Sequence, residues 1–157
     1  MQVEITKIQD KDIKGVKEFC LGIFEEMKWD KSFVYGFDNL KDFFSGKREV
    51  FFVAKFKKRI VACGGLKELS RDEGLLKRFY VAKEFRGKGL AEKMIKKIKE
   101  FAGEKRYKTI VLDVFKNNER AKKFFQKQGF QVFTPSSSEK WLESQHPEKF
   151  QFRRINL

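Results

Sequence analysis

A loop with two glycines, set between a β-rich run and an amphipathic helical run, constrains the fold of this chain more than any other feature. The loop reads Arg-Gly-Lys-Gly-Leu-Ala over residues 86–91. It follows residues 75–81, an apolar run typical of a strand, and it leads into residues 90–103, where apolar side chains recur at helical spacing. Glycines let backbone N–H groups approach a ligand that a Cβ would obstruct. The sequence therefore predicts a strand, an anion-binding turn and a helix in direct succession.

The predicted ligand of this loop is a pyrophosphate. Exposed amides and the positive end of a helix dipole attract phosphate, and Arg86 and Lys88 add positive charge beside them. Two other phosphate loops are excluded. A dinucleotide fingerprint needs glycine or alanine where Glu92 stands, and a Walker loop needs serine or threonine after Gly-Lys. The alternative is an ordinary glycine turn that caps a helix.

Strand-like and helix-like runs alternate along the rest of the chain. Strands are predicted at residues 3–5, 49–56, 59–66, 75–81, 109–115, 130–133 and 150–157, with Lys57-Lys58 as a hairpin turn and the last two runs paired. Four helices are predicted. The first is capped by Asp10 or Asp12 and carries residues 13–27, and the second runs from Asp38 to near Gly46. The third begins at the glycine loop and ends at Gly103, and the fourth runs from Asn117 or Asn118 to Gly129. The apolar residues of segment 75–81 do not stay on alternate positions along the predicted strand, which indicates a β-bulge within it. This order indicates an α/β (α+β) fold with a mixed sheet and helices on both faces.

Length and composition predict one globular domain over residues 1–157. A chain of 157 residues buries roughly two thirds of its unfolded surface. The first residues lack a signal-peptide pattern and no run approaches the roughly 20 apolar residues of a membrane span, so we expect a cytoplasmic protein. Cys20 and Cys63 lie in apolar patterns and are expected to be buried, reduced thiols. His146 is the only histidine, so no metal site is expected.

The loop and the segments around it resemble the GNAT superfamily of N-acetyltransferases. The family's pyrophosphate loop reads Gln or Arg, two residues, Gly, one residue, then Gly or Ala, and Arg86, Gly89 and Ala91 fit it. The resemblance extends upstream to residues 78–81 as the splayed strand and downstream to residues 118–121 with Gly129-Phe130. It covers nearly the whole order of elements. It implies the GNAT-like acyl-CoA N-acyltransferase fold, with a centrally splayed sheet, and acetyl-CoA as the cosubstrate that acetylates an amine.

The resemblance also assigns roles to residues. Those expected to contact CoA are Phe79, Val81, Arg86, Gly87, Lys88, Gly89, Leu90, Ala91, Asn118, Ala121 and Phe125. Amides of the loop would hold the pyrophosphate, backbone groups near Val81 would face the pantetheine and thioester, and Asn118 would contact the CoA arm. Asn118 is an equally good helix N-cap, and Val81 would be apolar in any core strand. We expect a monomer or a homodimer.

Acetyl transfer to an amine requires a base, and a carboxylate that acts directly or through water is the usual one. Glu73, just before the splayed strand, is the leading candidate, although many members carry their glutamate nearer the position of Leu75. A solvated turn residue is the alternative reading of Glu73, and Glu68 and Asp113 are further candidates. Many members place a tyrosine where this chain has Phe125, so Tyr80 or a water is expected to act as the acid.

The formal net charge of +14 leaves other function classes open. A basic chain with Phe51, Phe52 and Phe56 on a sheet also fits a nucleic-acid-binding module, but no arginine-rich tract or RNA-reading signature supports it. A CoA-binding regulatory domain without efficient catalysis is the other alternative. Lysines spread over solvated helix faces explain the charge without any partner. The acceptor cannot be read from the sequence.

Overall fold

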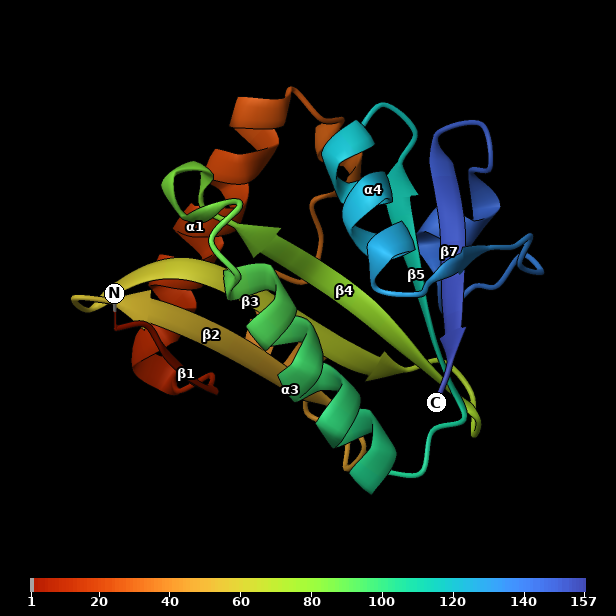
Figure 1. Cartoon of the computed structure of the whole chain (residues 1–157), viewed down its shortest axis with the longest axis horizontal. Helices are drawn as coiled ribbons and strands as arrows, with labels where there is room; N and C mark the ends of the chain where they lie inside the picture. Colours follow the sequence, from red (N-terminus) through yellow and green to blue (C-terminus); the bar gives the residue numbers. More distant parts are fainter. Residues whose placement is uncertain (1) are drawn as a thin grey trace.

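Seven strands pair into one mixed sheet (Figure 1). The computed structural model describes residues 2–157, and its strands lie in the order β1-β2-β3-β4-β5-β7-β6. The strands are β1 (Glu4–Lys7), β2 (Val50–Phe56), β3 (Arg59–Glu68), β4 (Glu73–Val81), β5 (Thr109–Phe115), β6 (Gln131–Val132) and β7 (Phe150–Asn156). Neighbours run antiparallel except β4 and β5, which are parallel. The predicted mixed sheet is confirmed.

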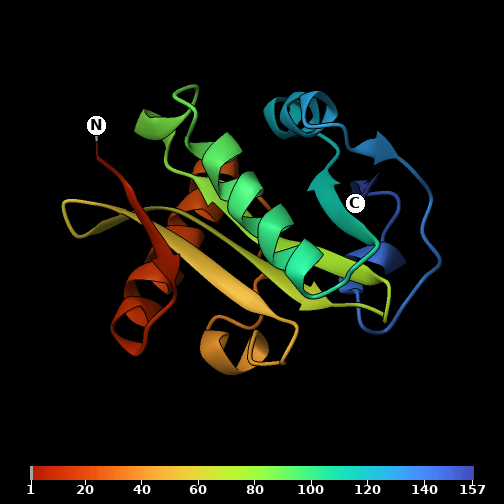
Figure 2. The ribbon, with the colours of Figure 1, turned by 60° about the horizontal axis from the view of Figure 1, so that its bottom comes forward.

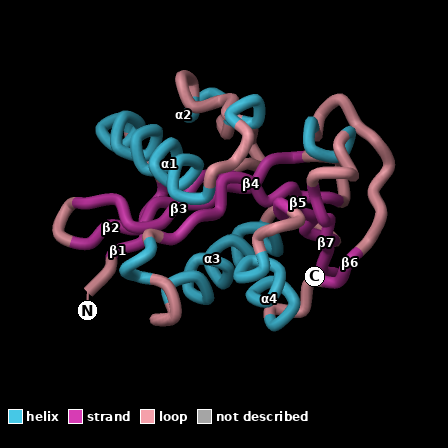
Figure 3. Tube along the Cα trace, turned by 90° about the horizontal axis from the view of Figure 1, so that it is seen from above, coloured by secondary structure: helices cyan, strands magenta, loops and turns pink. Residues whose placement is uncertain are grey.

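Helices cover both faces of the sheet. Seen from above, α3 (Leu90–Glu104) and α4 (Glu119–Lys127) lie on one face, and α1 (Ile13–Met27) and the short α2 (Leu40–Phe43) lie on the other (Figure 3). The short 3-10 helices are η1 (Asp10–Asp12), η2 (Lys31–Phe33), η3 (Lys83–Phe85) and η4 (Leu142–Gln145). Figure 2 shows β5, α4 and the C-terminal segments gathered on one side of the molecule, away from β1 and β2. Within residues 2–157 no helix combines the length and apolar character that crossing a membrane requires.

The central strands are buried on both faces. Successive side chains of a strand point to opposite faces, yet Leu75 and Leu76 are both buried. Leu76 packs in the cluster that contains Met94 of α3, whereas Leu75 packs in the cluster that contains Phe24 of α1 and Trp141. A strand covered on both faces reads as a continuous apolar run, which is why residues 75–81 lacked a clean alternation.

β4 also contains the predicted bulge. Cys63 of β3 pairs with Tyr80, but Gly65 pairs with Lys77, so β4 carries one extra residue between these pairs. Arg78, inside the bulge, has a φ of 56°, a left-handed conformation that costs most L-residues roughly 1–2 kcal/mol. Its Nη2 donates to the carbonyl oxygens of Phe33 at 2.9 Å and of Tyr35 at 2.8 Å, which holds the strained residue in place.

The two parallel strands pair over half their length and then separate. The ladder joins residues 73–76 of β4 to residues 109–112 of β5, and the pairing ends at Leu76 and Leu112. Figure 1 shows the arrowheads of β4 and β5 pointing apart. β5 instead stays paired with β7 as far as Phe115, opposite Phe150. The expected central splay is confirmed.

Most of the predicted elements are confirmed, but several of their bounds differ. The helix predicted from Asp38 to near Gly46 is only α2 (Leu40–Phe43), and the strand predicted over residues 130–133 is only β6 (Gln131–Val132). Gly129 ends α4 with a φ of 92°, as expected, but α3 passes through Gly103 and ends at Glu104. The left-handed residue after α3 is Arg106, whose amide donates to Gly103 O at 3.1 Å. β7 pairs with β6, as predicted, and it is also inserted beside β5.

Candidate active site

The glycine loop follows the splayed end of β4 and leads into α3. Gly87 has a φ of 74° and Gly89 a φ of 86°, both in the left-handed region that favours glycine. Gly89 is the N-cap residue of α3, so the first-turn N–H groups beyond it have no intrahelical partner. A Cβ on Gly87 would meet nothing within 4 Å. The loop thus presents unpaired amides and the positive end of a helix to open space, which suits an anion.

Arg86 connects this loop to two other elements. Its Nε donates to Val81 O at 2.9 Å, and its Nη1 and Nη2 reach the Glu26 carboxylate at 2.7 and 3.0 Å. The hydrogen bond from Arg86 lowers the pKa of Glu26. The Arg86 charge is therefore already paired with α1, whereas the side chain of Lys88 is exposed on the loop.

A cavity of about 70 Å³ lies between the separating strands. Of the residues expected to contact CoA, the cavity lining includes Phe79, Asn118, Ala121 and Phe125, and it also includes Tyr80. Phe79 and Phe125 pack with ring centroids 5.7 Å apart. The structure therefore brings the strand residues and the α4 residues together, while Val81 and the loop residues 86–91 lie outside the cavity lining.

Asn118 forms the N-cap of α4. Its Oδ1 accepts a hydrogen bond from the Ala121 amide at 3.3 Å, so the capping role weighed from the sequence is present. Asn118 is half-buried and lines the cavity as well. The start of α4 and the start of α3 thus both follow the diverging ends of parallel strands, where the splay opens.

A buried network of charged side chains forms one part of the cavity wall. Lys77 Nζ lies 2.7 Å from Glu143 Oε2 and 3.3 Å from Asp113 Oδ2. Trp141 Nε1 donates to the same Asp113 oxygen at 2.7 Å, and the Tyr35 hydroxyl donates to the Glu143 carboxylate at 2.7 Å. The side chains of Lys77 and Glu143 are only 4% and 3% exposed, and that of Asp113 is 14% exposed.

The two carboxyl groups of this network differ in acidity. Burial raises the pKa of Asp113, and the charge of Glu143 adds to the rise against the opposing effect of Lys77. Burial also acts on Glu143, but the Lys77 ammonium and the Tyr35 hydroxyl outweigh it and hold the pKa of Glu143 below its ordinary value. Burial raises the pKa of Tyr35 to about 12. Glu143 therefore balances the lysine, and Asp113 is the more basic carboxylate.

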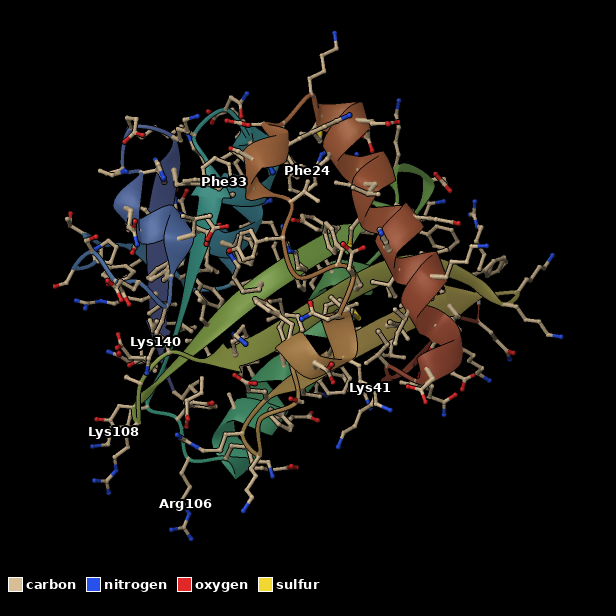
Figure 4. The ribbon with its side chains drawn as sticks, turned by 180° about the vertical axis from the view of Figure 1, so that it is seen from behind. Phe24, Phe33, Lys41, Arg106, Lys108 and Lys140 are labelled. Atoms are coloured by element: carbon tan, nitrogen blue, oxygen red, sulfur yellow. The ribbon has the colours of Figure 1, made fainter. Side chains whose placement is uncertain are left out.

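Aromatic side chains form most of the remaining wall. Trp29 stacks on Phe115 with ring centroids 4.8 Å apart and meets Phe24 edge-on at 5.3 Å. Phe33 packs edge-on against Phe150 at 4.9 Å. Figure 4 shows Phe24 and Phe33 at the same end of the molecule, where α1 and the following segment meet β5. Trp29 is buried, and its Nε1 has no hydrogen-bond partner among residues 2–157.

Two of the three carboxylates that the sequence offered as candidate bases lie outside the cavity. Glu73 begins β4 opposite Thr109, at the paired end of the strands, and accepts a hydrogen bond from Ser70 Oγ at 2.9 Å. Glu68 forms an exposed ion pair with Arg48. Neither lines the cavity, whereas Asp113 does. The predicted Tyr80 also lines it, and burial raises the pKa of its hydroxyl well above the ordinary value.

Sequence reasoning missed Lys77, Glu143 and Trp29 as members of the site. Glu143 lies in η4, a short segment without periodicity, and its partner Tyr35 is 108 residues away in sequence. One signal was available, because Lys77 interrupts an apolar strand run at a position that is buried on both sides. Within residues 2–157 no group of three or more His, Cys, Asp or Glu side chains is arranged to hold a metal ion.

Comparison with known proteins agrees with this geometry. The model of the family described as "Acetyltransferase (GNAT) family" matches residues 20–130. No curated protein gives a significant match.

Solved structures resemble the chain over its whole length. A GNAT-family acetyltransferase from Staphylococcus aureus is 21% identical with a TM-score of 0.88, and 99% of each chain is covered. An acetyltransferase from Streptococcus agalactiae is 18% identical with a TM-score of 0.83, covering 99% of this chain and 98% of the other. The PaiA N-acetyltransferase from Thermoplasma acidophilum, solved in complex with coenzyme A, is 17% identical with a TM-score of 0.77 and full coverage of both chains.

Proposed function

This chain belongs to the acetyltransferase (GNAT) family, and from that membership we propose that it transfers an acetyl group from acetyl-CoA to a primary amine. The observation that carries the amine assignment is the Asp113 carboxylate in the cavity of the splay, with a pKa raised by burial. A nucleophilic amine must lose a proton, and a buried carboxylate of raised pKa is suited to accept it.

The loop of residues 86–91 is the proposed pyrophosphate site. The left-handed glycines and the unpaired first-turn amides of α3 support this assignment. The pantetheine arm would then run into the splay, toward Phe79, Asn118 and Phe125, which line the cavity. Backbone groups of β4 beyond Leu76 have left the β5 ladder, so they are available to hydrogen-bond amide groups of the arm.

In the proposed reaction the amine nitrogen attacks the thioester carbonyl carbon, and the carbon–sulfur bond then breaks. The Asp113 carboxylate accepts the proton that the amine nitrogen loses. The Tyr80 hydroxyl, kept protonated by burial, donates a hydrogen bond to the departing sulfur, which leaves as the thiolate. Lys77 and Glu143 touch neither reacting atom in this scheme and act as positioning residues, because they fix the Asp113 carboxyl and set its charge environment.

Two linked measurements test the proposal. Calorimetry with CoA should show binding that is abolished in Gly89→Asp and largely retained in Gly89→Asn. Asn and Asp both tolerate the left-handed backbone, so only the Asp variant sets a negative charge against phosphate. Release of free CoA thiol from acetyl-CoA should then depend on an added amine. CoA binding without thiol release for any amine would make the chain a CoA-binding regulatory domain instead.

A further inference from the structure

A second and larger pocket lies at the edge of the sheet where β6 ends. β6 has two residues and β7 has seven, so residues 150–152 of β7 pair with β5 and lie outside the β6 ladder. Beyond β6, the Phe133 amide donates to Phe152 O at 3.0 Å. The pocket has a volume of about 570 Å³, within the roughly 300–1,000 Å³ of small-molecule sites. The short edge strand therefore leaves room for a small ligand.

The lining of this edge pocket is largely apolar. It includes the rings of Phe133, Phe150 and Phe152, together with Pro135 and Pro147. Phe150 and Phe152 are only 2% and 5% exposed and belong to a core cluster, so they form a fixed floor, whereas Phe133 is half-buried. An apolar body placed here would remove both its own surface and these rings from water, which favours binding.

The uncharged polar side chains of the lining are already engaged within the chain. Ser144 Oγ and Gln145 Nε2 donate to backbone carbonyl oxygens at 2.6 and 3.0 Å. Gln151 Oε1 accepts a hydrogen bond from Arg153 Nε at 2.8 Å. Recognition of a polar ligand group therefore depends mainly on the charged side chains of the pocket.

Those charged side chains are positive. Lys116 and Lys122 line the edge pocket, and among the described residues that line it none is an Asp or a Glu. The exposed side chain of Lys116 forms no ion pair within residues 2–157, whereas Lys122 lies 3.1 Å from the exposed carboxylate of Glu119. Arg154 stands over the Phe133 ring at 5.0 Å. One free ammonium and one that is already paired suit a ligand with a single negative charge.

The edge pocket is separate from the cavity in the splay. Phe150 lines both, but its ring is buried and packs against Phe115 at 4.6 Å and Phe33 at 4.9 Å, so it forms a wall between them. Lys116 and Lys122 line the edge pocket and not the splay cavity. A ligand in the edge pocket is therefore expected to bind without displacing CoA.

We propose that the edge pocket is a second ligand site, which binds a small monocarboxylate with an apolar, ring-sized body. The body lies on the floor formed by Phe150 and Phe152, beside Phe133, and the carboxylate faces Lys116 and Lys122. The inference concerns binding alone, so it does not depend on acetyl transfer or on the identity of the acceptor.

Three probes test the charge and the body separately. 3-Phenylpropionate carries both, 3-phenylpropanamide has the same body without charge, and propionate has the charge without the ring. Titrations of the nitrogen-15-labelled protein with CoA at saturation should shift the amide signals of residues 132–134 and 150–152. We expect 3-phenylpropionate to bind about two- to tenfold more tightly than the amide at low salt, as two exposed charge interactions allow. Propionate should bind about tenfold or more weakly, because it loses the ring that would be buried.

Charge variants give the control. Lys116→Gln combined with Lys122→Gln should remove the preference for 3-phenylpropionate over its amide, as should about 1 M salt, where the screening length is about 3 Å. Lys41→Gln combined with Lys108→Gln removes equal charge outside the lining and should leave the preference unchanged. Figure 4 shows Lys41 and Lys108 toward the opposite end of the molecule from Phe33.

A variant of the apolar wall tests the body of the ligand. Phe133→Ala removes a half-buried ring from the pocket and should weaken 3-phenylpropionate and its amide by the same factor. The charge variants act on the acid alone, so the two kinds of variant give different patterns of loss. Circular dichroism checks that each variant is folded.

Several results would overturn the inference and leave the proposed acetyl transfer standing. Equal affinity for the acid and its amide, the absence of binding at millimolar concentrations, or competition with CoA would each reject the edge pocket as the site. Signal shifts at residues 86–91 in place of the pocket would do the same. Sedimentation checks for self-association, and a dimer that Val132→Asp disrupts at the exposed edge would show that a second copy of the chain occupies the pocket instead.

Discussion

Lys77 is a charged residue at an interior position of a strand that is buried on both faces. Its ammonium stands between the carboxylates of Asp113 and Glu143. Burying such ions costs several kcal/mol each before their mutual attraction is counted, and apolar residues of similar volume often stabilise a fold as well. The network is therefore better explained by its effect on the Asp113 carboxyl than by a contribution to stability.

Asp113→Asn should lower kcat/KM by about a hundredfold or more, because the variant cannot accept a proton. The pKa of Asp113 is raised, so parent activity should fall as the pH drops through a value above the ordinary range of an aspartate, and this acidic limb should be missing in the variant. Rate profiles against pH, at a fixed fraction of unprotonated amine, measure both effects. In Glu143→Gln the limb should move to lower pH, since the Glu143 charge that raises the pKa of Asp113 is gone. An unchanged profile in Asp113→Asn would exclude Asp113 as the base.

Phe125→Tyr places a hydroxyl in the cavity wall beside Phe79. If departure of the thiolate limits the rate, single-turnover transfer at saturating acceptor should become faster, because a positioned acid contributes on the order of a hundredfold. A hydroxyl buried without a partner costs about 1–3 kcal/mol, so the unfolding free energy is measured alongside. Phe124→Tyr, the neighbouring position on α4, is the matched control. A destabilised Phe125→Tyr with no gain in rate would mean that Phe125 only fills the core.

The sequence could identify candidate catalytic carboxylates but could not show which of them lies in the site. Asp113, Glu73 and Glu68 all lie on or beside strands, and a sequence run does not say which end of the sheet is splayed. Tertiary structure decides, because the ladder that ends at Leu76 leaves Glu73 on the closed side and Asp113 on the open side. Glu143 had no local pattern that could have identified it.

Among the elements, the turn from β4 to α3 was the most predictable. Its glycines needed a left-handed backbone, and both have one. What the sequence could not supply is the partner of Arg86, because Glu26 lies on α1, 60 residues away. Arg86 therefore joins β4, the loop and α1, whereas Lys88 projects from the loop alone.

This difference predicts two kinds of loss in CoA affinity. Lys88→Gln should weaken CoA binding by up to about fivefold at low salt and scarcely at all at about 1 M salt, because an exposed charge is screened. Arg86→Gln should weaken it at every salt concentration and also lower the unfolding free energy by about 1–2 kcal/mol, since it breaks hydrogen bonds to Val81 and Glu26. Calorimetry at two salt concentrations and thermal unfolding distinguish the two variants. Identical salt dependence in both would contradict this division of roles.

The whole molecule consists of two sequence-contiguous parts joined through the β4–β5 ladder. Residues 2–104 supply the sheet from β1 to β4 and its helices, and residues 109–157 supply β5, β7, β6 and α4. The ladder between them has only four residue pairs. A second connection is apolar, because Phe24 and Trp29 pack in one cluster with Phe150 and Phe152.

We expect this apolar cluster to make the chain unfold as one cooperative domain. Denaturant unfolding followed by far-UV circular dichroism and by tryptophan fluorescence should give coincident transitions. Trp29 and Trp141 report from opposite parts of the chain, so two separate transitions would show that the parts unfold independently. Trp29→Ala, which removes a large side chain from the shared cluster, should lower the free energy of unfolding by about 3–5 kcal/mol.

The splay lies between the two parts of the chain, so a ligand bound there would hold the two parts together if they were separate fragments. A molecule that fills the opening touches β4 on one side and β5 and α4 on the other, so it behaves as a bifunctional cross-link that is not covalent. Ligand binding and association of the two parts are then linked equilibria, and each must strengthen the other by the same factor. If the chain were cut between α3 and β5, complementation of the two peptides would become a measure of acetyl-CoA concentration.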